Sequence, residues 1–494
     1  MSLQVSIPPE GLPSYDELHV ISDLHLGGDK GFQIFNSGAE AGWLIDQLAA
    51  EPAEKRIALL INGDLVDFLA EEDPRYFDPE GAVGKLNRIA TVDKSFQPVW
   101  DALRRFAQRK GRRLIINLGN HDVELALPWV RSRLLEILGD DDEAARGRIV
   151  LTFDGAGYLC RVGNATVLCV HGNEVDDWNV TDHETIRRIG RDVLHGLPVE
   201  RWIPNAGTQL VIDVMNGLKR QYPFIDLLKP EAQGAVPTLL ALAPAQRDKL
   251  LAITGTARRL VWDKVKRSAG LLGATEEGAR AGKPPARPVA AAFASDSRDQ
   301  ADILLRDAEE RLRCGVSPMA LIDGDEQGTY LGGFTALKKL FQGQSRSEVL
   351  REALDKLRED RSFDFQIEDD TFRSLDKKVG KEVDFVVAGH THLERALKRK
   401  ESRGFYFNTG TWVRLIRLEK PVLDDEQKFG QVFATFEKKS MEALDALPGL
   451  ILRRLTVASF QVEGGKTRGE LRRVETGAGG LALEPVAGSQ FIRD

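Results

Sequence analysis

The sequence predicts an α/β protein in which buried strands alternate with helices. Five short apolar runs rich in β-branched residues end at motifs that contain Gly, Asp or His, a pattern typical of buried strands bounded by turns. Between two runs, Ile57–Ile61 and Arg113–Leu118, the residues Val99, Leu103 and Phe106 share one face of a helix expected near Phe96–Arg109. A long segment between residues 172 and 381 has a mostly helical pattern. We therefore expect an α/β core with a large helical insertion.

The motifs that end the strands carry side chains suited to divalent metal ions. In an open α/β sheet, loops at the carboxyl ends of neighbouring strands meet in one crevice, so these side chains are expected to converge. Carboxylate and amide oxygens, with neutral imidazoles, can hold two ions about 3.5–4 Å apart. Each motif alone is common in polar turns, and only the ordered set is specific. The motifs are Ser22-Asp23-Leu24-His25, Gly63-Asp64-Leu65-Val66-Asp67, Gly119-Asn120-His121-Asp122, Val170-His171-Gly172-Asn173 and Gly389-His390-Thr391-His392.

The ordered set resembles that of the calcineurin-like metallophosphoesterase family, over roughly residues 15–176 and 383–415. The resemblance implies a four-layer αββα sandwich and two divalent ions bridged by Asp64. Mn²⁺ is the ion we expect for such nitrogen and oxygen ligands, with Zn²⁺ and Fe²⁺ left open because affinity order does not identify the physiological ion. By the resemblance, one ion is held by Asp23, His25, Asp64 and His392, and the other by Asp64, Asn120, His171 and His390.

His121 has no place among these ligands and is a candidate catalytic residue. We expect its imidazole to face the phosphate, where it donates to an equatorial oxygen or protonates the leaving group. Asp122 is the second candidate, expected to orient that imidazole. Asp67 is expected either to support the ligands or to cap the turn that follows it.

The expected reaction is hydrolysis of a phosphodiester or pyrophosphate bond by a hydroxide that bridges the two ions, since metal charge lowers the pKa of bound water. Ile21–Gly27, Gly389–His392 and Asn408–Trp412 are similar to segments of UDP-2,3-diacylglucosamine pyrophosphatases. A UDP-sugar-lipid or nucleotide-linked substrate is therefore a candidate. Many members of that subfamily carry Arg where this chain has His121, and the insertion here is longer than a simple lid.

Two alternatives are left open, one a second enzyme function and the other of a different functional class. The first is a DNA-processing nuclease, against which the acidic balance and the absence of long heptads count. The second is a non-catalytic scaffold or regulatory module, against which the complete ligand set counts.

Pattern and composition divide the chain into four parts. Residues 1–172 and 383–460 are expected to form the two parts of the core, separated by the mostly helical insertion over 173–382. The insertion is interpreted as a cap or lid over the site, with an accessory domain pointing away as the alternative. It contains a Pro-, Ala- and Gly-rich stretch near 274–300 that predicts a flexible loop. Residues 461–494 are expected to be a C-terminal tail that is partly flexible.

Local signals also predict single elements. Capping boxes at Thr181–Glu184 and Ser345–Glu348 predict two helix starts. Gln431–Phe436 and Leu452–Phe460 have strand-like patterns and are expected to complete the second sheet.

Composition limits the partners and the location. The chain of 494 residues is 42% hydrophobic and 29% charged, which is typical of a globular protein with two or more structural units. The net charge of −7 argues against broad binding to nucleic acid, and three cysteines indicate no disulfide framework. Neither a signal peptide nor an apolar stretch of about 20 residues is evident. We expect a cytoplasmic protein that acts on a phosphorylated small-molecule or lipid-linked substrate, with peripheral membrane contact left open.

Overall fold

The computed structural model describes residues 11–200, 202–205, 207–208, 211–212, 216–229, 238, 241–242, 345–477 and 479–493. The chain divides into two compact units. One combines Met1–Glu231 with Lys356–Asp494, and the other is Ala232–Asp355, which lies inside the insertion expected over 173–382. The loop expected near 274–300 lies outside the described residues. In the second unit, α14 (Arg346–Ala353) begins with the expected capping box of Ser345 and Glu348.

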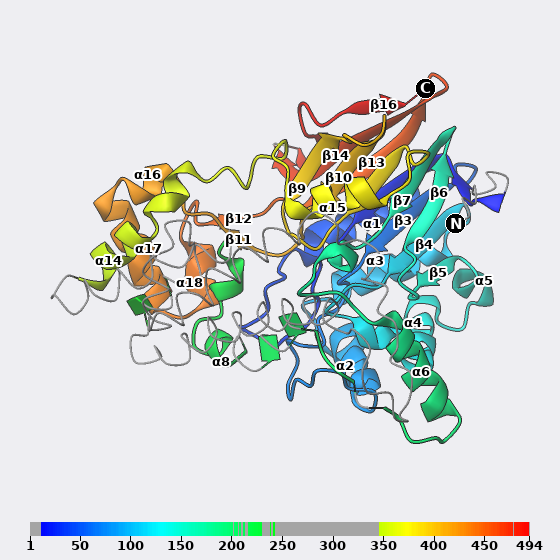
Figure 1. The fold of residues 1–494 in the computed structure, drawn as a ribbon, viewed down its shortest axis with the longest axis horizontal. Coiled ribbons are helices and arrows are strands. Elements are labelled where there is room, and N and C mark those ends of the chain that lie inside the picture. The colour runs from blue at the N-terminus through cyan, green and yellow to red at the C-terminus, as the bar shows by residue number, and fades with distance from the viewer. Residues whose placement is uncertain are drawn as a thin grey trace, which may run out of the picture. The chain divides into compact units, whose positions relative to one another are not determined.

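The larger sheet of the first unit has eight strands, and its centre is parallel (Figure 1). The order is β15-β14-β13-β2-β3-β4-β5, and β16 also pairs with β14. The pairs β2–β3, β3–β4 and β4–β5 are parallel, with Ile61 opposite both Ile21 and Ile116, so these strands end at one edge. The strands are β2 (Glu17–Ile21), β3 (Ile57–Asn62), β4 (Arg112–Asn117), β5 (Ile149–Thr152), β13 (Thr456–Glu463), β14 (Lys466–Gly477), β15 (Gly480–Pro485) and β16 (Phe491–Arg493).

The second sheet has six strands in the order β1-β6-β7-β8-β10-β9. β7, β8 and β10 run parallel, so the loops after β7 and β8 also share an edge. The strands are β1 (Ser14–Tyr15), β6 (Tyr158–Val162), β7 (Ala165–Cys169), β8 (Phe385–Ala388), β9 (Glu394–Lys398) and β10 (Phe405–Thr409).

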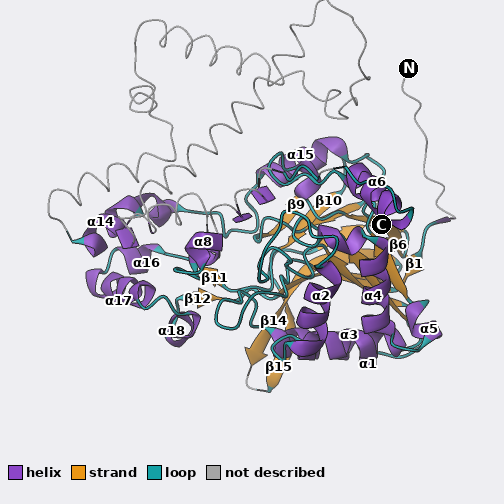
Figure 2. Ribbon diagram, turned by 90° about the horizontal axis from the view of Figure 1, so that it is seen from below, coloured by secondary structure: helices purple, strands orange, loops and turns teal. Residues whose placement is uncertain are grey.

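The sheets and helices form four layers, which confirms the αββα fold class. Alternate residues of β3 face opposite layers: Ala58 and Leu60 belong to the core between the sheets, whereas Leu59 and Ile61 belong to the core beneath the helices. Figure 2 shows α1 to α4 along one side of the strands and α15 on the other. These helices are α1 (Gly38–Ala50), α2 (Ala82–Asn87), α3 (Gln97–Gln108), α4 (Pro128–Gly139) and α15 (Asp370–Lys378).

Two buried asparagines link the sheets near the strand ends. Asn117 donates to Asn62 Oδ1 at 2.7 Å and to Cys169 O at 3.1 Å, and Asn62 donates to Val170 O at 2.7 Å. Unpaired amides would be costly here, so these bonds fix β3 and β4 against β7.

Further elements of the first unit lie around the short β11–β12 pair. Leu228 bridges to Ile416 of β11, and the Phe224 ring stacks on Phe436 of α17 at 4.5 Å between centroids. The elements are β11 (Leu415–Ile416), β12 (Ile451–Leu452), α8 (Asn216–Lys219), α16 (Lys420–Leu423), α17 (Glu426–Glu437) and α18 (Met441–Ala446). The remaining described α-helices are α5 (Glu143–Arg146) and α6 (His183–Leu194).

Three local predictions are corrected. Gln431–Phe436 is part of helix α17 and not a strand. Residues 466–493, expected as a partly flexible tail, instead supply strands β14, β15 and β16. Helix α6 is capped by Asp182, whose side chain accepts from the Thr185 N–H, and not by Thr181. Among the described helices, none is long and apolar enough to cross a membrane.

Candidate metal centre

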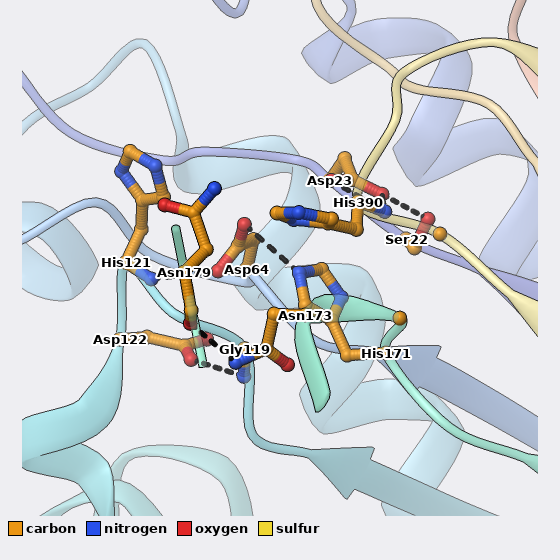
Figure 3. Close-up of polar contacts among 12 residues, drawn as sticks. Ser22, Asp23, Asp64, Gly119, His121, Asp122, His171, Asn173, Asn179 and His390 are labelled. Carbon is orange, nitrogen blue, oxygen red and sulfur yellow. Dashed lines mark hydrogen bonds and ion pairs between the residues drawn. The ribbon is translucent and has the colours of Figure 1, made fainter. Parts of the chain in front are cut away.

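The five motifs converge at the shared strand ends. Asp23 and His25 follow β2, Asp64 follows β3 and Asn120 follows β4 of the eight-stranded sheet. His171 follows β7, and His390 and His392 follow β8, in the six-stranded sheet. Figure 3 shows Asp64 between His171 and His121. The edge of both sheets thus places all seven predicted metal ligands in one region.

The first predicted ligand set comes together directly. Asp23, His25 and His392 form a group of potential ligand atoms within 4.8 Å of one another. His25 Nε2 lies 3.1 Å from His392 Nε2, and His392 Nε2 lies 3.3 Å from Asp23 Oδ1. Two imidazole nitrogens this close, facing a carboxylate, match the donor set of a divalent ion.

The second predicted set comes together in part. Asp23, Asp64 and His171 form another such group, and His171 Nε2 lies 3.2 Å from Asp64 Oδ2. His390 belongs to none of the groups found among the described residues, and its Nε2 lies 2.8 Å from Asp176 Oδ2. Any metal contact of His390 would therefore be made through Nδ1.

A buried polar atom without a partner supports a metal at this position. His171 Nε2 is buried against the Asp64 carboxylate, 3.2 Å away. Within the described part of the chain, Asn120 Oδ1 is buried and makes no hydrogen bond. Leaving such atoms unpaired costs about 1–3 kcal/mol each, so native structures rarely tolerate it without a ligand or water. The amide oxygen and the imidazole nitrogen are both metal donors, and the residues present fit two divalent ions.

The backbone adds an independent signal. Eight described non-glycine residues have a positive φ, and five of them are predicted metal ligands: Asp23, His25, Asp64, His390 and His392, at φ 48–68°. Each left-handed non-glycine residue costs about 1–3 kcal/mol and persists where the surroundings enforce it, often at functional sites. The strain is therefore concentrated on the residues that the motifs single out.

A comparison with known families agrees with this geometry. The matched family is described as calcineurin-like phosphoesterase. Residues 18–221 form a calcineurin-like phosphoesterase domain. The chain is accordingly a metal-dependent phosphoesterase. No curated protein matches the chain. The matched range ends before His390 and His392, yet the fold brings both histidines to the phosphoesterase site.

Three imidazoles of the phosphoesterase site have a partner at the second nitrogen. His171 Nδ1 lies 2.7 Å from the Asn62 carbonyl oxygen, which leaves Nε2 facing Asp64. His25 Nδ1 lies 3.4 Å from Asp67 Oδ2, and Asp176 holds His390 Nε2. Carboxylate and carbonyl partners of this kind fix the ring orientation of metal-bound histidines.

The partner of His121 differs from the prediction. His121 Nδ1 lies 3.2 Å from Asp67 Oδ1, so Asp67 and not Asp122 orients this ring. Asp67 also accepts the N–H groups of Leu69 and Ala70, as expected of a turn cap. His121 lies closer to the ligands than its motif implied, since it forms a group with His25 and Asp64.

Asp122 instead holds two loops together. It is fully buried and accepts the N–H groups of Gly119 at 2.7 Å and Leu65 at 2.9 Å. Burial and the nearby charge of Asp64 raise the pKa of Asp122 to about 8. Its role is to position the loops that carry Asp64 and Asn120.

The buried charges of the site balance one another. Burial alone would raise the pKa of Asp64, but His171 and His121 hold it well below its usual range. Burial would lower the pKa values of these imidazoles, yet the carboxylates raise that of His171 to about 10 and that of His121 to about 9. Burial and the charge of Lys229 lower the pKa of His392 to about 4.

Asp176 was missed by motif reasoning. It follows the fourth motif in an acidic stretch, but nothing in its spacing showed that it would contact His390. The contact arises because β7 and β8 are neighbours in the sheet although more than 200 residues separate them in the chain.

Proposed function

We propose that this phosphoesterase hydrolyses a phosphodiester or pyrophosphate bond with two divalent ions that share Asp64. One observation carries the proposal: Asp64 Oδ2 lies 3.6 Å from His25 Nε2 and 3.2 Å from His171 Nε2. A single carboxylate thus faces both donor groups, which is the arrangement of a two-metal site.

The donor set assigns each residue a place. Asp23, His25, His392 and Asp64 would hold one ion, and Asp64, Asn120, His171 and Nδ1 of His390 would hold the other. When bound, the ions would polarise the phosphoryl oxygens and lower the pKa of water. We propose Mn²⁺ as the ion, because nitrogen and oxygen donors suit it.

His121 supplies proton chemistry beside the donor groups. Its ring centroid lies 4.7 Å from that of His25, and its Nδ1 is directed to Asp67. In the site without metal ions, the carboxylates of Asp67 and Asp64 raise the pKa of His121 to about 9, which favours the protonated imidazole. Nε2 is then available to donate to a phosphate oxygen or to the leaving group.

For the substrate, we propose a nucleotide-linked or UDP-sugar-lipid phosphate. Its support is the similarity of Asn408–Trp412 and the first and fifth motifs to UDP-2,3-diacylglucosamine pyrophosphatases. In the structure these residues secure the site: Asn408 donates to Gly389 O at 2.7 Å, and Thr411 donates to Asp23 O at 2.8 Å. They support the two-metal chemistry more strongly than they support a particular substrate.

The direct test is hydrolysis of bis-p-nitrophenyl phosphate with Mn²⁺ and with chelator. Asp64→Ala removes the shared carboxylate and should abolish turnover, while Asp46→Ala, which changes an exposed partner of Arg105 on α1, should retain it. Bound metal, measured by mass spectrometry, should fall in Asp64→Ala alone. Chelator-resistant turnover, or full activity of Asp64→Ala, would refute the proposal.

A further inference from the structure

A basic pocket lies outside the cluster of ligand residues. It has a volume of about 130 Å³. A water needs about 10–15 Å³ on the same measure, so the pocket has room for a phosphate group. Its lining includes four cationic and two anionic side chains: Lys229, Arg358, Arg417, Lys420, Asp360 and Glu419.

The two arginines are held in place by neighbouring groups, and the backbone of Lys229 lies beside them. The backbone N–H of Lys229 donates to Ile416 O at 3.2 Å, next to Arg417. The Arg417 guanidinium lies 4.9 Å above the centroid of the Phe363 ring, and its Nη1 lies 2.8 Å from Glu419 Oε1. Arg358 is anchored by the carbonyl oxygen of Leu423 at 3.2 Å. Pre-organised guanidinium groups bind phosphate and carboxylate groups with little loss of side-chain freedom.

A short segment connects the pocket to the metal centre. Trp412 N and Thr411 Oγ1 both donate to the carbonyl oxygen of Asp23, at 3.2 and 2.8 Å. Arg417 is five residues beyond Trp412, and five residues span at most about 18 Å. One extended substrate can therefore reach both places.

We propose that this pocket binds a second anionic group of the substrate, such as a second phosphate, while the scissile phosphate lies at the metal centre. The inference rests on the proposed function and adds a specificity determinant to it. The lining carries two more positive than negative side chains, and Lys420 is exposed at its rim. Charge-assisted hydrogen bonds to such a group would be realised only by substrates that carry it.

The test compares two esters that differ by one phosphate: thymidine 5′-(p-nitrophenyl phosphate) and its 3′-phosphorylated form. The wild-type protein should prefer the 3′-phosphorylated ester, mainly through a lower KM. Arg417→Gln should reduce this preference about tenfold, the loss expected for one hydrogen bond to a charged group. Lys420→Gln should reduce it in the same direction. Arg187→Gln removes an exposed arginine of α6 that pairs with Glu184, and it should keep the wild-type preference.

The outcomes separate the inference from the proposed function. Equal use of the two esters by the wild type would overturn the inference and leave the phosphoesterase function standing. An equal loss of kcat/KM on both esters in Arg417→Gln, with the ratio unchanged, would also overturn it, since that is the signature of a structural role. If the wild type hydrolysed bis-p-nitrophenyl phosphate but neither nucleotide ester, the inference would fail alone, whereas no turnover of any of the three esters would overturn the proposed function as well.

Discussion

At the residue scale, the contacts of each histidine decide which nitrogen is left for a metal. Asp176 engages Nε2 of His390 at 2.8 Å, and the Asn62 carbonyl oxygen engages Nδ1 of His171 at 2.7 Å. The two rings therefore present opposite nitrogens to the site. These partners hold the rings in place without serving as ligands themselves.

Replacing Asp176 by Asn should weaken metal binding without preventing folding. Asn keeps the size and the acceptor for the Trp178 N–H, which lies 2.9 Å from Asp176 Oδ1, but it loses the charge that favours the required His390 tautomer. Loss of such a partner typically reduces metal affinity about 10–100-fold. The Mn²⁺ dependence of turnover measures this shift. Asp46→Asn is the exposed control and should keep the wild-type Mn²⁺ affinity. An unchanged Mn²⁺ affinity in Asp176→Asn would show that Asp176 is not required to orient His390.

Glu124 should make stability depend on pH independently of the metal centre. It is buried beside the site, where Oε1 accepts the Asp78 N–H at 3.0 Å, and burial raises its pKa from 4.5 to about 7. Because the folded-state pKa is raised, the protonated form stabilises the fold at low pH, and that stability is lost as pH rises from about 4.5 to about 7. Glu124→Gln should thus gain up to about 3 kcal/mol over the wild type by pH 8.

Urea unfolding at pH 5 and pH 8 measures the Glu124 effect. The advantage of Glu124→Gln should be near its maximum at pH 8 and fall to about a quarter of that value at pH 5. Glu136→Gln, on the exposed side of α4, should show no such difference. If Glu124→Gln changed the free energy of unfolding equally at pH 5 and pH 8, Glu124 would not titrate between these pH values.

Motif reasoning predicted the donor side chains and Asp67, but not the other groups that contact the rings. Asp23, Asp64 and His171 are visible in sequence because each ends an apolar strand. The role of Asp122 differs from the prediction, because adjacency in the chain suggested that it supports His121. The structure shows that Asp122 accepts backbone N–H groups, and that choice depends on loop geometry, which sequence spacing does not encode.

At the element scale, the turns after the strands bring the ligands together because their glycine backbones lie very close to ligand side chains of neighbouring strands. A Cβ atom on Gly119 would overlap the Asp64 carboxylate, with only 2.7 Å to its Cγ. Similarly, a Cβ on Gly389 would lie 2.6 Å from Asp23 Oδ2. Glycine is needed at these turns because ligands from neighbouring strands occupy the space of a side chain.

Gly119→Ala should displace Asp64 and reduce turnover at least about 100-fold, since small misplacements of catalytic groups have effects of this size. Metal content should fall as well, because both donor groups share Asp64. Gly84→Ala is the matched control: its added methyl would meet nothing within 4 Å on helix α2. That control should be neutral or stabilise by about 1 kcal/mol. Wild-type turnover in Gly119→Ala would show that the loop adapts without cost.

Strands ending at motifs were predictable, whereas the C-terminal elements were not. β8 and the first five residues of β3 are short apolar runs followed closely by Gly, a pattern that predicts a buried strand. In α17 the buried residues Phe429, Val432, Phe433 and Phe436 follow the helical period, but a window starting at Gln431 hides Phe429 and favours a strand. The Gly-rich composition of the C-terminal residues suggested flexibility. These residues are ordered because β14 pairs with β13, and such a tertiary contact is not visible in local sequence.

At the scale of the whole molecule, the fold around the metal centre should form without bound metal ions. Its carboxylates face imidazoles whose pKa values are raised, to about 10 for His171 and about 9 for His121, so ion pairs can replace metal charge in the same positions. The two sheets around it are joined by their own core and by Asn62 and Asn117. Chelation should therefore lower the melting temperature but leave the far-ultraviolet circular dichroism at 25 °C unchanged.

The same charge balance predicts that metal uptake releases protons. His171 must be neutral at Nε2 to bind an ion, yet its pKa of about 10 keeps it protonated without one at pH 8. Binding of Mn²⁺ should then release about one proton per protein from this residue, and affinity should rise with pH up to about 10, because deprotonation favours the bound state. Calorimetric titrations in Tris and in Hepes measure this release, since the apparent enthalpies differ by the protons that each buffer takes up. Identical enthalpies in the two buffers would show that His171 is already neutral and that a carboxylic acid, such as Asp122, holds the proton within the metal-free site.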